Sequence, residues 1–189
     1  MSNVLRLCLD LNIWCAALLA DLKGRQNTSS QYLVKIVRQG VCSLGQVQLI
    51  VSWGMLNRLR SVLEKDLGVS YTAAHLYIDA IRGYAELGTI GGSPQLTLGG
   101  TGVIPLSDTE DAHVLETALA GRATVLVTAN FKDFISNDTR TILPGRHLIY
   151  AAPAHVFHIT HPYLMMDWLR VGQIPALVNT DETRSFWIE

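Results

Sequence analysis

The chain has 189 residues, of which 49% are hydrophobic, and its formal net charge at pH 7 is −1. This length and composition predict one domain with a sizeable core and argue against a strongly basic nucleic-acid-binding protein, while leaving room for a local basic patch. Three cysteines without C-x-x-C spacing are typical of small buried side chains in a reducing compartment: Cys8, Cys15 and Cys42. Arg6 and Asp10 interrupt the first apolar run, which is therefore not typical of a signal peptide, and no apolar stretch of about eighteen residues predicts a membrane span. We expect a cytoplasmic protein.

Strand and helix patterns alternate along the chain. Short apolar runs predict strands over residues 4–9, 47–51, 103–106, 124–128 and 147–150. Apolar residues at helical spacing predict helices over residues 13–22, 30–40, 52–63, 71–87, 110–120 and 163–171, with a flexible connection over 89–102. Helices between apolar strands indicate an α/β fold with a mostly parallel, doubly wound sheet.

Residues 103–134 carry the strongest local signals. Ser107 followed by Glu110 is a capping-box pattern, and Gly121 lies where a helix should stop. The continuous apolar run that follows, VLVT, is typical of a strand covered on both faces. The segment is therefore an α/β repeat whose polar residues lie at strand ends, the edge where ligands bind in open parallel sheets.

The last forty residues are harder to interpret. Three histidines at three-residue steps, His155, His158 and His161, do not share one helix face and have no cysteine beside them, so we expect surface histidines rather than a zinc site. The helix over 163–171, with Trp168 on its apolar side, either covers the sheet or presents a surface to a partner.

Three acids far apart in sequence meet at one edge of such a sheet. Asp10 follows the first strand, Asp111 lies in the first turn of the helix after the 103–106 strand, and Asp133 follows VLVT. Asp10 could instead be a simple helix N-cap. Carboxylates brought together repel and need a counter-ion, and an all-carboxylate pocket suits Mg²⁺ or Mn²⁺ better than zinc. A metal held there would activate water and polarise a phosphoryl oxygen, which predicts phosphodiester hydrolysis.

These residues resemble a known family. LDLN (9–12) is similar to the N-terminal D-x-N of PIN-domain nucleases, and DTEDAHVLETALAGRATVLVTANFKDF (108–134) resembles the D-x-x-D and T-x-N-x-x-D-F segment of that family. The final T-x-N-x-x-D-F form is similar to VapC-type toxins of bacterial toxin–antitoxin pairs. The resemblance spans residues 4 to about 150 and implies a PIN-like three-layer α/β/α domain over 1–150, with 151–189 as a C-terminal extension packed on the domain or on a partner.

The resemblance also implies roles for individual residues. Asp10, Asp111 and Asp133 would be the catalytic residues and would hold Mg²⁺ or Mn²⁺. Three further side chains would support them: Asn12 and Asn130 would orient ligands or water, and Thr128 would support the turn. Asp108 and Glu110 either lie outside the metal ligands as further acids or only start the helix. The helix dipole favours acids in the first turn, so we expect the structural role. Glu116 is expected to face solvent.

One position departs from the family pattern. The family usually has a glutamate where this chain has Arg58, and Glu64 lies about 120° away around the helix. Arg58 would weaken metal binding and could contact the scissile phosphate instead. Arg58, Arg60 and Lys65 could equally be a solvated helix face.

The sequence therefore leaves three functions open. The first is a metal-dependent endoribonuclease that acts on RNA, with a small antitoxin protein and a homodimer as implied partners. The second is a catalytically weakened PIN fold that binds RNA or protein. The third, a nucleotide-binding or receiver-like domain, lacks a phosphate loop and a lysine after the last recognisable strand.

Overall fold

The computed structural model describes residues 4–87, 96–97, 109–153 and 155–177. Its parallel strands are β1 (Val4–Leu9), β3 (Gly45–Ser52), β5 (Val125–Val127) and β8 (His155–Thr160), with the short β4 (Leu96–Thr97) beside β3. The antiparallel strands are β2 (Val41–Cys42), β6 (Thr139–Leu143) and β7 (His147–Ala152). They form one sheet in the order β2-β3-β1-β5-β8-β7-β6. The predicted mixed α/β fold with a mostly parallel sheet is confirmed.

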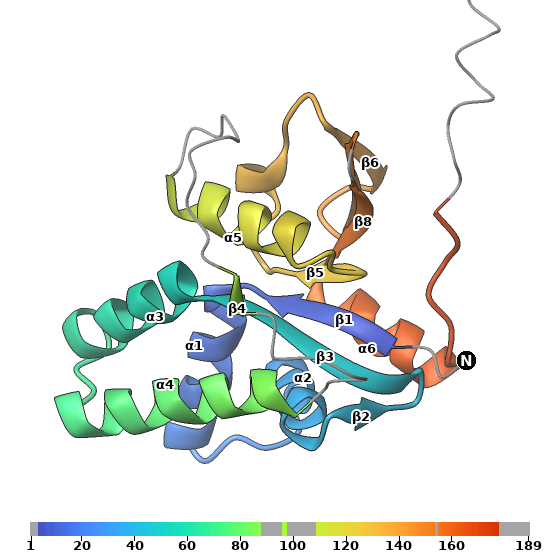
Figure 1. The fold of residues 1–189 in the computed structure, drawn as a ribbon. Coiled ribbons are helices and arrows are strands. Elements are labelled where there is room, and N and C mark those ends of the chain that lie inside the picture. The colour runs from blue at the N-terminus through green and yellow to red at the C-terminus, as the bar shows by residue number, and fades with distance from the viewer. Residues whose placement is uncertain (1–3, 88–95, 98–108, 154, 178–189) are drawn as a thin grey trace, which may run out of the picture.

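Helices cover both faces of this sheet. One side carries α1 (Leu11–Leu22), α2 (Ser29–Gln39) and α4 (Tyr71–Glu86), with α6 (Pro162–Val171) beside α2. Helix α5 (Thr109–Ala120) packs on β3 and β5 from the opposite side, and α3 (Trp53–Lys65) continues from the end of β3 (Figure 1). The predicted strand over 103–106 lies outside the described residues.

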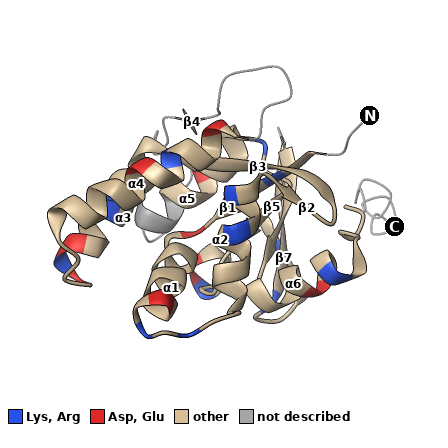
Figure 2. Ribbon diagram, turned by 90° about the horizontal axis from the view of Figure 1, so that it is seen from below, with Lys and Arg blue, Asp and Glu red and all other residues tan. Residues whose placement is uncertain are grey.

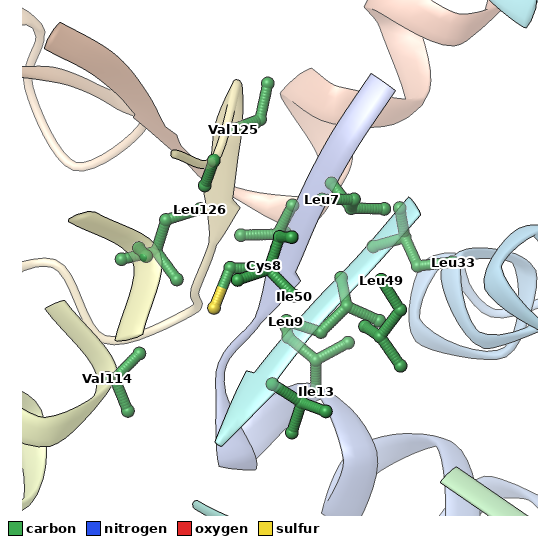
Figure 3. Packing of buried hydrophobic residues seen from close by; sticks show 14 of the residues in the cluster. Leu7, Cys8, Leu9, Ile13, Leu33, Leu49, Ile50, Val114, Val125 and Leu126 are labelled. Carbon is green, nitrogen blue, oxygen red and sulfur yellow. The ribbon is translucent and has the colours of Figure 1, made fainter. Parts of the chain in front are cut away.

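The core is centred on β1, which has β3 on one side and β5 on the other. Leu7, Cys8 and Leu9 are fully buried between the side chains of those two strands (Figure 3). Because both faces of β1 are covered, its sequence is apolar on both faces rather than alternating, apart from Arg6. Cys8 is accordingly buried, as predicted, whereas Cys15 and Cys42 are half-buried.

Local capping residues determine where the helices begin and end. Ser52 caps α3 through its hydroxyl, as predicted, but α2 begins after Thr28 rather than at Ser30 because Thr28 and Gln31 form a capping box. Gly121 ends the α5 segment as expected: a Cβ atom there would collide with Ile50 on β3. Arg6 on β1 donates to the carbonyl of Gly121 from Nε at 2.9 Å and Nη2 at 2.7 Å. These contacts set the position of α5 against the sheet.

The segment after residue 150 takes a larger part in the sheet than an extension would. The expected boundary at residue 150 falls inside β7, which was predicted as the last strand but is followed by β8. Strand β8 lies between β5 and β7. Helix α6 turns Met165, Trp168 and Leu169 inward, as expected for the alternative in which this helix covers the domain.

Two buried histidines hold this C-terminal part together. Nε2 of His147 lies 2.9 Å from Nδ1 of His158, and Nε2 of His158 lies 3.1 Å from the carbonyl oxygen of Pro175. The Trp168 ring contacts both imidazoles edge-on. Burial lowers the pKa of His147 to about 4, with the neighbouring His158 as a second cause, and burial also lowers the pKa of His158. The prediction of surface histidines is therefore wrong for His158, because it lies on a central strand.

This pair predicts a loss of stability in mild acid. Below pH 6.5 the unfolded chain binds a proton at His147 that the folded chain does not, so the free energy of unfolding falls as the pH drops from 6.5 to about 4. His147→Gln keeps a donor toward His158 without titrating. Urea unfolding at pH 7.5 and at pH 5.0 measures the free energy of unfolding at each pH. Between the two, we expect this free energy to fall by about 1 kcal/mol less in the variant than in the wild type. An equal loss in both proteins would contradict the assignment.

Candidate active site at the carboxyl edge of the sheet

Asp10 lies where β1 ends and α1 begins. Its side chain is 4% exposed and accepts hydrogen bonds from Leu11 N, Asn12 Nδ2 and Thr128 Oγ1, each at 2.6 Å. Burial raises the pKa of this carboxyl group, while the hydrogen bonds from Thr128, Leu11 and Asn12 oppose the rise. The residue is thus an N-cap, as the simpler interpretation held, but one whose charge is largely removed from water.

Asn12 and Thr128 join the ends of two parallel strands around that carboxylate. The register Leu9 to Val127 places Asp10 beside Thr128, whose side chain is fully buried. Asn12 donates from Nδ2 to Thr128 Oγ1 at 3.1 Å and accepts from Ala129 N at 3.3 Å. Both residues therefore fix the orientation of Asp10.

The turn after β5 brings Asp133 into the same network. Thr128 Oγ1 accepts from Asn130 N at 2.9 Å, and Asn130 Nδ2 donates to Asp133 Oδ2. Asp133 lies in the short 3₁₀ turn η1 (Lys132–Phe134) and is half-buried. A continuous chain of hydrogen bonds therefore runs from Asp10 through Thr128 and Asn130 to Asp133.

For the third predicted acid, Asp111, the structure describes only its position on a helix. Asp111 lies in the first turn of α5, and the side chains of 109–112 are outside the described part of the chain, as is Asp108 entirely. Thr117 of α5 lies 2.8 Å, hydroxyl to hydroxyl, from Ser52 at the carboxyl end of β3, and both are fully buried. Asp111 precedes Thr117 by six residues, or about 9 Å of helix. The first turn of α5 therefore reaches beyond the carboxyl end of β3.

Thr117 is a positioning residue that the sequence analysis missed. The signal was present, because Thr117 is a polar residue within the apolar stripe of Val114, Leu115 and Ala118. The neighbouring Glu116 was expected to face solvent, and that prediction is wrong, since Glu116 is only 8% exposed. Strands β3 and β5 and the turn η1 all pack against α5, so more of the helix surface is buried than its apolar stripe alone predicts.

Helix α3 carries the position that departs from the family pattern. Arg58 is exposed on the second turn of the helix, whereas Glu64 lies in its last turn, twelve residues or about 18 Å beyond Ser52. Oε1 of Glu64 is buried and has no hydrogen-bond partner in the described structure. Its distance along the helix agrees with the expectation that Glu64 does not replace the missing glutamate.

Comparison with known proteins identifies the family. The family model described as PIN domain matches residues 6–132, about two thirds of the chain. The protein therefore belongs to the PIN-domain family and has a nuclease-type fold. No curated protein and no solved structure gives a significant match. Within the described ranges, no helix is long and apolar enough to cross a membrane.

The donors at this edge fit the divalent ions that PIN domains generally use. Asp10 and Asp133 offer carboxylate oxygens, the ligands that hard cations prefer, and a cation would compensate the buried charge of Asp10. Among the side chains that the structure describes, no three acids, histidines or cysteines gather around one point, and that set does not include Asp111. In the predicted layout, the third carboxylate is that of Asp111, in the first turn of α5.

The buried charge of Asp10 predicts a trade-off between stability and function. Without metal, Asp10→Asn removes a desolvated charge and keeps the side-chain shape, so we expect Tm in EDTA to rise by roughly 2–4 °C, equivalent to about 1 kcal/mol. Differential scanning calorimetry would measure the change, with the exposed Asp138→Asn as a control that leaves Tm unchanged. A lower Tm for Asp10→Asn would mean that the three hydrogen bonds outweigh the desolvation.

Proposed function

We propose that this PIN-domain protein is a metal-dependent endoribonuclease that hydrolyses RNA phosphodiester bonds. The observation that carries the proposal is the buried carboxylate of Asp10, held in one orientation by the ends of two strands and linked to Asp133 through Thr128 and Asn130. A buried, pre-oriented acid that has no cationic partner in the described part of the chain is costly for a purely structural role and suited to binding a cation.

Each residue has a distinct part in this proposal. Asp10, Asp111 and Asp133 would hold Mg²⁺ or Mn²⁺, which when bound supplies an activated water and polarises the phosphoryl oxygen. Asn12 and Thr128 act on Asp10 as positioning residues, and Asn130 acts in the same way on Asp133. Ser52 and Thr117 hold α5 against the sheet and so determine where its first turn, with Asp111, lies.

A toxin of a toxin–antitoxin pair is the biological role that we propose for this activity. The T-x-N-x-x-D-F form over 128–134 supports it, and a small antitoxin protein and a second copy of the chain are the corresponding partners. The free cysteines agree with a cytoplasmic location.

Cleavage of RNA with and without metal tests the enzyme directly. With Mg²⁺ or Mn²⁺ present we expect fluorescently labelled single-stranded RNA to be cut, and Asp111→Asn or Asp133→Asn to slow cleavage at least about 100-fold, because each removes one charge from the ligand set. EDTA should abolish cleavage, and the exposed Asp167→Asn should cut at the wild-type rate. Equal activity in Asp111→Asn and the wild type would reject the proposed site.

Arg58 favours a second candidate function, a PIN fold that binds RNA or protein without cutting it. A guanidinium on α3 in place of the family glutamate adds positive charge where the family has a ligand. We expect Arg58→Glu to tighten Mn²⁺ binding about tenfold or more in calorimetric titration, while Lys65→Glu at the exposed far end of the same helix leaves it unchanged. Absence of binding by the wild type at millimolar Mn²⁺ would favour the binding module, and recovery in Arg58→Glu would identify the missing ligand as the cause. Tight binding by the wild type would reject the binding module.

A further inference from the structure

A row of aromatic rings leads from the candidate site to the surface. The chain leaves β5 and β8 side by side, because Thr128 N donates to Thr160 O at 3.0 Å. Phe131, between Asn130 and Asp133, stacks on His161 with ring centroids 6.2 Å apart and planes 23° apart. His161 in turn lies 5.0 Å from the ring of Tyr163. The row begins with a buried ring at Phe131 and ends with Tyr163, which is 64% exposed.

The exposed ring borders a hollow that carries positive charge. Tyr163 lines a hollow of about 290 Å³ together with Lys23, Arg25 and the hydroxyl residue Ser29, which come from the end of α1, the loop after it and the start of α2. Basic residues lie on that loop, below α1 in Figure 2. Lys23 and Arg25 are exposed, and within the described part of the chain neither side chain forms an ion pair. The nearby acid Asp21 accepts a hydrogen bond from Gln31 Nε2 at 2.5 Å.

This combination has the chemistry of a single-strand binding site. Unpaired bases stack on exposed aromatic rings, whereas the bases of a duplex are stacked on each other and cannot. Two cations beside the ring can neutralise the phosphates of one or two nucleotides, and they matter more in a chain of net charge −1, which has no general attraction for a polyanion. The aromatic row connects this hollow to the turn that holds Asn130 and Asp133.

We propose that Tyr163, Lys23 and Arg25 form a subsite for single-stranded RNA that the aromatic row joins to the candidate active site, with a base stacked on Tyr163 and phosphates at the two cations. The proposal rests on the proposed ribonuclease function, because it gives that site a substrate of stated class: RNA with unpaired bases.

Fluorescence anisotropy of a labelled twelve-nucleotide RNA tests the subsite on the full chain, in EDTA so that no cleavage occurs. We expect the single strand to bind more tightly than the same sequence as a duplex, and Tyr163→Ala to weaken single-strand binding about tenfold, within the range for loss of one base stack. Tyr71→Ala, which removes an equally exposed tyrosine from α4, should bind as the wild type does. Both tyrosines are exposed, so both variants should fold, and their melting temperatures verify this.

The salt dependence tests the two cations separately. Lys23→Gln with Arg25→Gln should weaken binding and reduce the slope of log affinity against log salt by about 1.4, as expected for two lost phosphate contacts on a single strand. Lys35→Gln with Arg38→Gln on the exposed side of α2 should leave the slope unchanged. Equal affinity in Tyr163→Ala and the wild type, or an unchanged slope in the Lys23 and Arg25 variant, would overturn the subsite.

The two proposals fail in different ways. RNA that binds through Tyr163 in EDTA but is not cut when Mn²⁺ is added supports the subsite and rejects the nuclease. RNA that is cut with the same KM by Tyr163→Ala and the wild type supports the nuclease and overturns the subsite.

Discussion

The candidate site and the centre of the sheet share one constraint, the burial of the Asp10 carboxylate. Asp10 lies between the end of β1 and the start of α1, and its carboxylate is satisfied by one backbone N–H and two side chains, Asn12 and Thr128. Thr128 directly follows β5, more than a hundred residues away, so the charge can be buried only when β1 and β5 lie side by side in the register that pairs Leu9 with Val127. The parallel pairing at the centre of the sheet and the geometry of the candidate site are therefore one and the same arrangement.

Much of the fold could be predicted because its signals are local. Strand β1 follows from its mostly apolar run, helix α5 from the helical spacing of its apolar residues, and the start of α3 from the Ser52 cap. Strand β8 was missed because its sequence, HVFHIT, contains two histidines and a threonine where a central parallel strand usually has apolar residues. His158 is tolerated there because His147 and the carbonyl of Pro175, neither of them near it in sequence, satisfy both ring nitrogens. No pattern within the strand carries that information.

The same distinction applies to the candidate site. The positions of Asp10, Asn12, Thr128, Asn130 and Asp133 follow from strand ends that the sequence marks clearly, and their hydrogen bonds join the groups that the resemblance brought together. The contact of Thr117 with Ser52 depends on how closely α5 approaches β3, which Gly121 permits and Arg6 fixes. The burial of Glu116 depends on the same approach. Helix periodicity indicates which side of α5 is apolar, but the width of the covered side is a property of the packing.

The charge distribution explains why catalysis and binding would be divided between separate residues. An RNA backbone is repelled by an acidic pocket, so the acids that hold a cation cannot also be the groups that attract the substrate. With a net charge of −1 the chain has no excess of positive charge to compensate, and attraction must come from a few cations placed outside the pocket or from uncharged contacts such as stacking. Tyr163, Lys23 and Arg25 lie in such a place, one row of rings away from Asp133. Stacking on Tyr163 requires an unpaired base. The contact that compensates for weak electrostatic attraction would therefore also select single-stranded RNA as the RNA that reaches the carboxylates.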